Sequence, residues 1–219
     1  MSDDSKRPKC ASIECETRDN CTVHLMPPLF ILTIDVDWAS EYCIATLMEA
    51  MRERGIIPVV HVTHKSEVLS RMVEADEVVL GIHPNFLPGS SHGTTIGEVF
   101  DHVFALAPNA RIWRSHALFD QTAASTEAAR RGILYRSNTF AWLEPNLRPV
   151  RHFTNLLEFP IFWEDDVHLW RGEELEPSRF FEAFLTPGLK VLNLHPFFFA
   201  LNCPSMRYYR PVRMSGTEK

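Results

Sequence analysis

Short apolar runs alternate along the chain with amphipathic segments, and this alternation predicts an α/β fold. The apolar runs over residues 29–34, 56–62 and 78–82 predict strands, and the first is a continuous run with β-branched members that suits a strand buried on both faces. Between the first two runs, residues 40–54 carry apolar side chains at helical spacing, and Ser40 can cap this helix. Strands that alternate with helices favour a largely parallel sheet covered by the helices.

The same alternation continues towards the C-terminus and favours a distorted, partly closed (β/α) barrel of about six to eight mostly parallel strands. In such barrels the reactive groups gather at the C-terminal ends of the strands. Further helices are predicted over residues 65–74, 95–107, 122–131 and 178–185, and further strands over residues 112–114, 158–163 and 190–194.

The length of the chain indicates a single domain, and its net charge argues against one class of partner. The 219 residues fit a polar N-terminal extension over residues 1–28 followed by a single domain over residues 29–219. The formal net charge of −6 argues against nucleic acid as a partner, since phosphate binding needs a basic face. The N-terminus lacks the apolar stretch of a secretion signal, and no run reaches transmembrane length, so a cytoplasmic protein is expected. The oligomeric state is left open.

The cysteines also favour a reducing compartment, because they number 5 and no pair has C-x-x-C spacing. Cys10, Cys15, Cys21 and His24 are possible metal ligands, but their spacing does not match a zinc-knuckle motif. A poorly ordered polar extension is the stronger interpretation of this segment.

Candidate catalytic residues follow the first and third predicted strands. The motif T-I-D-V-D-W places Asp35 and Asp37 on the same face of an extended chain. One carboxylate could bind a metal while the other acts as a base, or the two could form a solvated acidic turn. His83 follows the third strand, and His92 returns after a loop rich in Pro, Gly and Ser. Two imidazoles and a carboxylate leave a position open for water, as catalytic zinc requires; the alternative is a pair of structural histidines.

Later strand ends carry further polar residues. Arg114, in W-R-S-H, could keep a neighbouring catalytic carboxylate ionised, or it could form a surface ion pair. His195, in L-N-L-H, could act as a general acid, or it could be a packed core histidine. In F-W-E-D-D, residues 162–166, one acid could orient His195, or all three could be solvated. His116 is left without a role, and His61 is interpreted as structural.

Taken in order, these motifs resemble those of the NodB-homology polysaccharide deacetylases, carbohydrate esterase family four. T-I-D-V-D resembles the first motif, G-I-H-P-N-F with the later His92 the second, R-S-H the third and L-N-L-H the last. H-P-N-F-L-P-G-S-S-H-G and F-W-E-D-D-V-H look more like a divergent subgroup, the WbmS-like proteins encoded among O-antigen and surface-polysaccharide genes. The usual second motif is H-x-x-x-H, but position 87 is Leu here, so His92 is taken as the second histidine.

The resemblance implies a metal-dependent carbohydrate N-deacetylase. Asp35 is implied to be the base, assisted by Arg114, and His195 the acid that protonates the departing amine. The implied substrate is a small molecule or glycan with an N-acetyl or related acyl group, a precursor in surface-polysaccharide biosynthesis. The metal is expected to be zinc, and the implied ligands are Asp37, His83 and His92.

Two other classes of protein are alternatives to a deacetylase. D-x-D after an apolar strand also opens the haloacid-dehalogenase phosphatases, which need Thr or Val where this chain has Ala39. Those enzymes also need a Lys before an acidic pair, whereas Lys190 follows the acidic run here. The second rival is a deacetylase-like protein that binds a sugar or a metal without turnover, and measured turnover would separate it from the enzyme.

Overall fold

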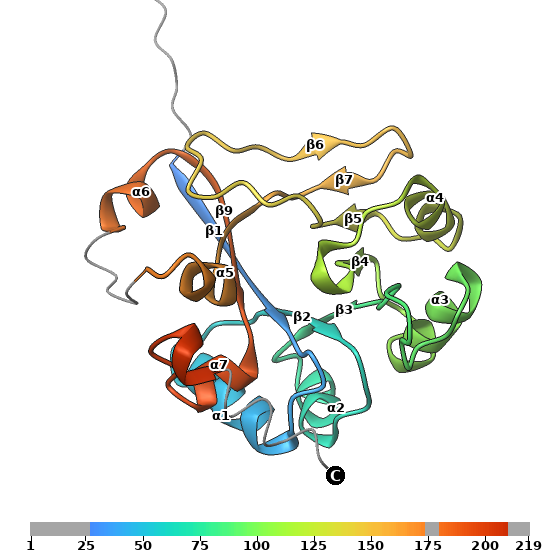
Figure 1. Ribbon diagram of the computed structural model, residues 1–219, viewed down its shortest axis with the longest axis horizontal. Helices are drawn as coiled ribbons and strands as arrows, with labels where there is room; N and C mark the ends of the chain where they lie inside the picture. Colours follow the sequence, from blue (N-terminus) through green and yellow to red (C-terminus); the bar gives the residue numbers. More distant parts are fainter. Residues whose placement is uncertain (1–26, 174–179, 210–219) are drawn as a thin grey trace, which may run out of the picture.

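The computed structural model describes residues 27–173 and 180–209, so the extension predicted over residues 1–28 lies almost wholly outside the described residues. The described chain forms a curled sheet with helices around its outer side (Figure 1). Its strands are β1 (Pro28–Asp35), β2 (Val59–Val62), β3 (Val79–Ile82), β4 (Ile112–Trp113), β5 (Tyr135–Arg136), β6 (Val150–Arg151), β7 (Leu157–Glu158), β8 (Ile161–Glu164) and β9 (Gly188–Leu194).

Helices are present in the segments predicted over residues 40–54, 65–74, 95–107 and 122–131, whereas the short helices over residues 165–170 and 196–200 were not predicted. In α1 the Ser40 side chain accepts a hydrogen bond from the backbone N–H of Cys43, and α3 begins with the capping box of Thr95 and Glu98. The helices are α1 (Glu41–Arg52), α2 (Glu67–Glu74), α3 (Ile96–Leu106), the 3₁₀ turn η1 (His116–Leu118), α4 (Thr122–Arg130), α5 (Asp165–Trp170), α6 (Phe181–Leu185) and α7 (Pro196–Ala200).

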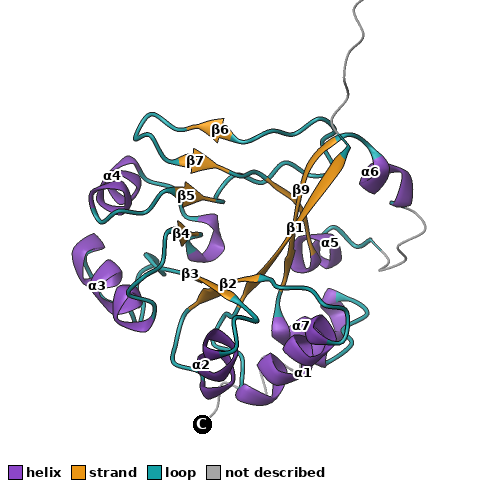
Figure 2. Cartoon of the chain, turned by 180° about the vertical axis from the view of Figure 1, so that it is seen from behind, coloured by secondary structure: helices purple, strands orange, loops and turns teal. Residues whose placement is uncertain are grey.

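The sheet has the strand order β6-β7-β5-β4-β3-β2-β1-β9-β8. Every pair of neighbouring strands in the described residues is parallel except β6 and β7, which lie together at one edge (Figure 2). A parallel bridge between Phe140 and Ile161 connects the segment after β5 with β8 and curls the sheet towards closure. The observed fold is therefore a mixed α/β half-barrel, in the class that the alternation predicts.

The strand count differs from the prediction, because the described residues hold 9 strands and not six to eight. β5, β6 and β7 have 2 residues each, too few to produce an apolar run that the sequence pattern could reveal. The strand predicted over residues 158–163 is divided between β7 and β8 by Phe159 and Pro160. Proline has no N–H to donate to a strand ladder, so a break at this position is expected.

The central strands carry the core and bring the candidate residues to one rim. Ile34, Ile82 and Trp113 are fully buried on β1, β3 and β4. Because the strands that bear the site are parallel, the residues at their C-terminal ends meet at the same side of the sheet. In the part of the chain that the structure describes, no helix is both long and apolar enough to cross a membrane.

Candidate functional site

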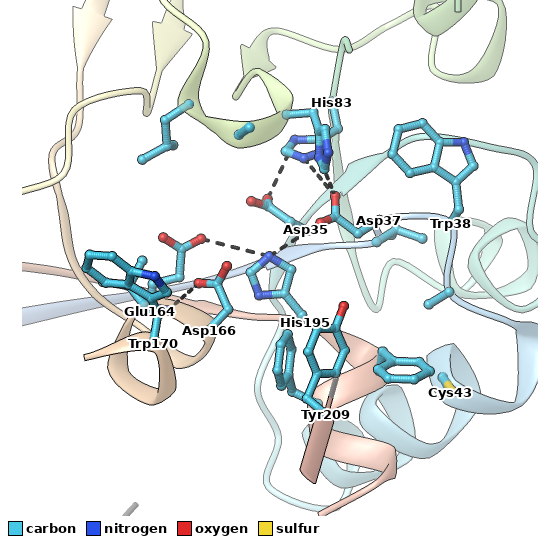
Figure 3. A pocket seen from close by; sticks show the side chains of 18 of the residues that line it. Asp35, Asp37, Trp38, Cys43, His83, Glu164, Asp166, Trp170, His195 and Tyr209 are labelled. Carbon is cyan, nitrogen blue, oxygen red and sulfur yellow. Dashed lines mark hydrogen bonds and ion pairs between the residues drawn. The ribbon is translucent and has the colours of Figure 1, made fainter. Parts of the chain in front are cut away.

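A pocket of about 820 Å³ opens at the C-terminal ends of β1, β3, β8 and β9. Its wall combines carboxylates and imidazoles that are far apart in sequence, and Figure 3 shows them pointing towards one another. The aromatic side chains of Trp38, Trp170 and Tyr209 complete other parts of the wall. The polar residues of the lining that bear on chemistry are Asp35, Asp37, His83, His116, Glu164 and His195.

Asp35 ends β1 and is almost fully buried. Its Oδ1 accepts hydrogen bonds from His61 Nδ1 at 2.9 Å and Arg114 Nη1 at 3.1 Å, and its Oδ2 accepts one from Asn193 Nδ2 at 3.0 Å. Burial raises the pKa of Asp35, but Arg114, His83 and His61 outweigh burial and hold the pKa well below its usual range. The structure thus places Arg114 beside the carboxylate, where its positive charge favours the ionised form.

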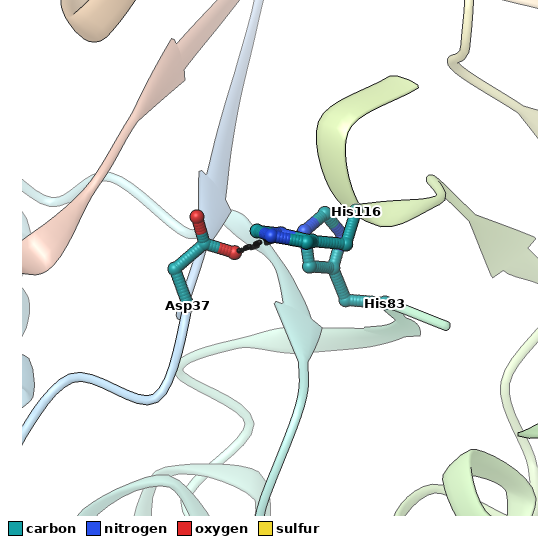
Figure 4. A group of neighbouring side chains, drawn as sticks. All are labelled: Asp37, His83 and His116. Atoms are coloured by element: carbon teal, nitrogen blue, oxygen red, sulfur yellow. Dashed lines mark hydrogen bonds and ion pairs between the residues drawn. The ribbon is translucent and has the colours of Figure 1, made fainter. Parts of the chain in front are cut away.

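Asp37 lies in the turn after β1, where Asp37 and Trp38 both adopt positive φ angles, 47° and 56°. This turn aims the Asp37 carboxylate at two imidazoles: Oδ1 lies 3.0 Å from His83 Nε2 and 3.0 Å from His116 Nδ1 (Figure 4). Burial raises the pKa of Asp37, but the hydrogen bonds with His116 and His83 outweigh burial. The pKa therefore lies well below its usual range. The donor atoms of these three residues all lie within 4.8 Å of one another, a spacing suited to one metal ion.

The structure does not bring His92, which the sequence spacing assigned as the second metal histidine, to this group. Its Nδ1 accepts a hydrogen bond from the backbone N–H of Asn85 at 3.1 Å, and its Nε2 lies 2.9 Å from the backbone oxygen of Thr63. Both ring nitrogens of His92 therefore contact backbone groups of neighbouring loops. The imidazole next to Asp37 and His83 belongs to His116, a residue to which the sequence pattern assigned no role.

His195 lies across the pocket from the imidazole group. Its Nδ1 is 2.6 Å from Asp165 Oδ1, and its backbone N–H donates to Asp165 Oδ2 at 2.8 Å. Its Nε2 is directed into the site, 3.7 Å from Asp37 Oδ2 and 3.9 Å from Glu164 Oε1. Burial lowers the pKa of His195, but Asp165 and other carboxylates outweigh burial and raise the pKa well above its usual value. Of the alternatives left open for the acidic run, the structure therefore favours an acid that orients His195.

His61 contacts the site, although its position at a strand end did not distinguish it from a structural histidine. Its side chain is fully buried, and burial followed by the charge of Arg114 lowers its pKa to about 4. A neutral imidazole donates from one ring nitrogen, so His61 Nδ1–H donates to Asp35 and fixes that carboxylate. The ring fits because the neighbouring residue on β3 is Gly81: a Cβ there would lie 2.7 Å from His61 Cδ2.

Gly81→Ala should therefore displace His61 and destabilise the protein by about 1–3 kcal/mol, the usual cost of an overpacked core. Thermal or denaturant unfolding measures this effect. Gly97→Ala is the matched control, because a Cβ at Gly97 meets only Thr95 Oγ1 at 4.0 Å. Equal stability of the two variants would show that β3 can move away from His61 without cost.

A family model of WbmS-like polysaccharide deacetylases matches residues 32–213 of this chain. The search of curated proteins found no match. Among solved structures, the chain is similar to a candidate polysaccharide deacetylase involved in O-antigen biosynthesis from Bordetella bronchiseptica. The two share 28% sequence identity with a TM-score of 0.78, and the likeness covers 84% of this chain and 78% of that chain.

More distant structures show the fold alone. A candidate polysaccharide deacetylase from Mycobacterium smegmatis has 16% identity and a TM-score of 0.57, with 84% of this chain and 83% of that chain covered. A 4-alpha-glucanotransferase from Thermococcus litoralis has 13% identity and a TM-score of 0.55, with 88% of this chain and 36% of that chain covered. Since this fold carries more than one reaction, the family is shown by the model match and not by the fold. That match extends over most of the sequence, and the chain belongs to the WbmS-like polysaccharide deacetylase family.

Proposed function

We propose that the protein is a metal-dependent hydrolase that removes an N-acetyl or related acyl group from a sugar precursor in surface-polysaccharide biosynthesis. The observation that carries this proposal is that Asp37, His83 and His116 line one pocket with donor atoms within 4.8 Å of one another, beside the Asp35 carboxylate and the His195 imidazole. The family and the O-antigen role stated for the Bordetella relative support the class of substrate.

The residues that would hold the metal are Asp37, His83 and His116. One carboxylate and two imidazoles are a donor set that suits zinc and leaves a coordination position free. A divalent ion bound there supplies a Lewis acid that activates water and polarises the acyl carbonyl. His83 Nε2 and His116 Nδ1 each lie 3.0 Å from the same Asp37 oxygen, and this proximity supports the assignment.

The two proton-transfer groups lie on neighbouring strands. Asp35 ends β1, is ionised, and serves in this proposal as the base that accepts a proton from the attacking water. His195 follows β9, which pairs with β1, and serves as the acid that protonates the departing amine. Asp165 keeps the imidazole of His195 in place, so its Nε2 faces the pocket.

The metal assignment is tested by comparing His116→Ala with His92→Ala. His116→Ala should lose most of the bound metal, because it removes one of three ligands, whereas His92→Ala should retain about one ion per chain. Elemental analysis of the purified proteins measures the metal, and unfolding curves confirm that both variants are folded. Metal loss in His92→Ala but not in His116→Ala would restore the set expected from the family spacing.

Turnover separates the hydrolase from the non-catalytic alternative. The proposal expects release of acetate from N-acetylated sugars, such as an N-acetylglucosamine tetramer, that stops when the metal is removed with a chelator. A protein that holds the metal fully and releases no acyl group from any such sugar would favour a binding role.

A further inference from the structure

A row of polar side chains crosses three neighbouring strands beneath the pocket. In the strand register, Thr33 on β1 pairs with Asn193 on β9, and Asn193 pairs with Glu164 on β8. The Thr33 hydroxyl donates to Asn193 Oδ1 at 2.8 Å, and Asn193 Nδ2 donates to Glu164 Oε1 at 2.7 Å. The parallel register therefore places Glu164 in the site, although no motif of the sequence had distinguished it from its acidic neighbours.

Asn193 holds two carboxyl groups with a single amide. Its Nδ2 has two hydrogens, and it lies 3.0 Å from Asp35 Oδ2 as well as 2.7 Å from Glu164 Oε1. The Thr33 hydroxyl, which contacts Asn193 Oδ1, fixes the orientation of the amide. Asp35 and Glu164 are thus kept close together, with oxygens within 4.8 Å of each other.

Asp35 and Glu164 differ in the number of hydrogen bonds that they accept. Asp35 also accepts hydrogen bonds from Arg114 and His61, whereas within the described residues Glu164 accepts a hydrogen bond from Asn193 alone. Both side chains are buried, 2% and 5% exposed, so two adjacent negative charges would be costly. The partners of Asp35 stabilise its charge, and the proton of the pair therefore falls to Glu164.

The surrounding charges also favour a proton on Glu164 and a negative charge on Asp35. Burial, then the carboxylates of Asp166 on α5 and Asp35 on β1, raise the pKa of Glu164 above its usual range. His195 and Arg114 act in the opposite direction, but His195 Nε2 lies 3.9 Å away and Arg114 is bonded to Asp35. Glu164 Oε1 is occupied by Asn193, which leaves Oε2 to carry the proton.

We propose that Glu164 is a substrate-binding carboxylic acid that is protonated at neutral pH and donates a hydrogen bond from Oε2 to a hydroxyl or ring oxygen of the bound sugar. This inference rests on the proposed function, since the substrate is the sugar of that reaction. Glu164 lines the pocket, and its carboxyl group lies within 4.8 Å of polar side-chain atoms of both Asp35 and His195. A sugar oxygen held by Glu164 therefore lies beside both proton-transfer groups (Figure 3). No proton leaves Glu164 in this role; it positions the sugar.

Infrared titration tests the protonation without any substrate. The metal-loaded protein should show the band of a protonated carboxyl group at pH 7, and Glu164→Gln should lose that band. Asp166→Asn is the matched control: the band should persist and should titrate at lower pH, because a neighbouring negative charge has been removed. If the band is absent from the unaltered protein, or is lost in Asp166→Asn and kept in Glu164→Gln, the inference is wrong.

The contact with substrate is tested by two substitutions with opposite hydrogen-bonding capacity. Glutamine is neutral and can still accept from Asn193 and donate into the pocket, so Glu164→Gln should keep kcat/KM on the N-acetylglucosamine tetramer within a few-fold. Glu164→Ala should lose roughly tenfold or more, since the donor is removed and Asn193 loses a partner. Equal losses in both variants would show that a carboxylate is needed and overturn the inference. An unaltered protein that is inactive on the tetramer would count against the proposed function, while the infrared band still decides the state of Glu164.

Discussion

Asp35→Asn should lower the rate of amide hydrolysis by about 10²- to 10⁴-fold while the protein binds as much metal as before. The asparagine cannot accept a proton from water, and Asp35 is not a member of the Asp37, His83 and His116 group. Steady-state kinetics on an N-acetylated sugar and elemental analysis measure the two effects separately.

The same substitution has a cost in stability that must be measured beside the rate. Every oxygen of Asp35 faces a donor, from His61, Arg114 or Asn193, so the new amide N–H₂ would face at least one of them. A buried donor without an acceptor costs about 1–3 kcal/mol. Rates are therefore compared at a temperature where unfolding curves show both proteins folded. A rate close to that of the unaltered protein would mean that another group activates the water.

His195→Ala should reduce amide hydrolysis by about 10²- to 10⁴-fold and reduce hydrolysis of 4-nitrophenyl acetate by less than about tenfold. A departing amine needs a proton in the transition state, whereas a phenolate leaves without one. The metal content should not change, because His195 Nε2 lies 3.7 Å from Asp37 and on the far side of the pocket from His83.

Asp165→Asn is the companion variant for His195. It keeps the imidazole but weakens the contacts that orient it, so its loss on the amide should be smaller than that of His195→Ala. Equal losses of His195→Ala on the amide and on the aryl ester, or a loss of metal, would assign His195 to metal binding or to structure.

The strand ends were the part of the site that the sequence could predict. Asp35, His83, Arg114 and His195 each follow an apolar run, so their positions could be inferred from where the runs stop. The structure brings these four to one rim because the strands that carry them are parallel.

The choice between His92 and His116 could not be made from the sequence. It depends on the path of two loops, and hydrophobic periodicity carries no information about loop paths. In the structure, His92 contacts the backbone groups of Asn85 and Thr63, whereas His116 contacts Asp37. The only indication in the sequence was that His116 closely follows the strand predicted over residues 112–114.

Asn193 and His61 were missed for a different reason. Each lies in or at the end of an apolar strand, and its role exists only through the strands beside it. Asn193 joins β1 to β8, and His61 reaches Asp35 across the β1–β2 pair. Strand order and register decide such contacts, and a single sequence predicts neither.

The central β1–β9 pairing has a consequence for the order in which the site can be assembled during synthesis. Residues 28–34 pair with residues 188–194, so a strand made early must wait for one made late. The group of Asp37, His83 and His116 is complete once residue 116 has been made, whereas Asn193 and His195 are made later. Until then one edge of β1 has no strand beside it, and contacts this distant in sequence slow folding. Refolding from denaturant should accordingly be slow, and metal capture should precede the gain of hydrolytic activity.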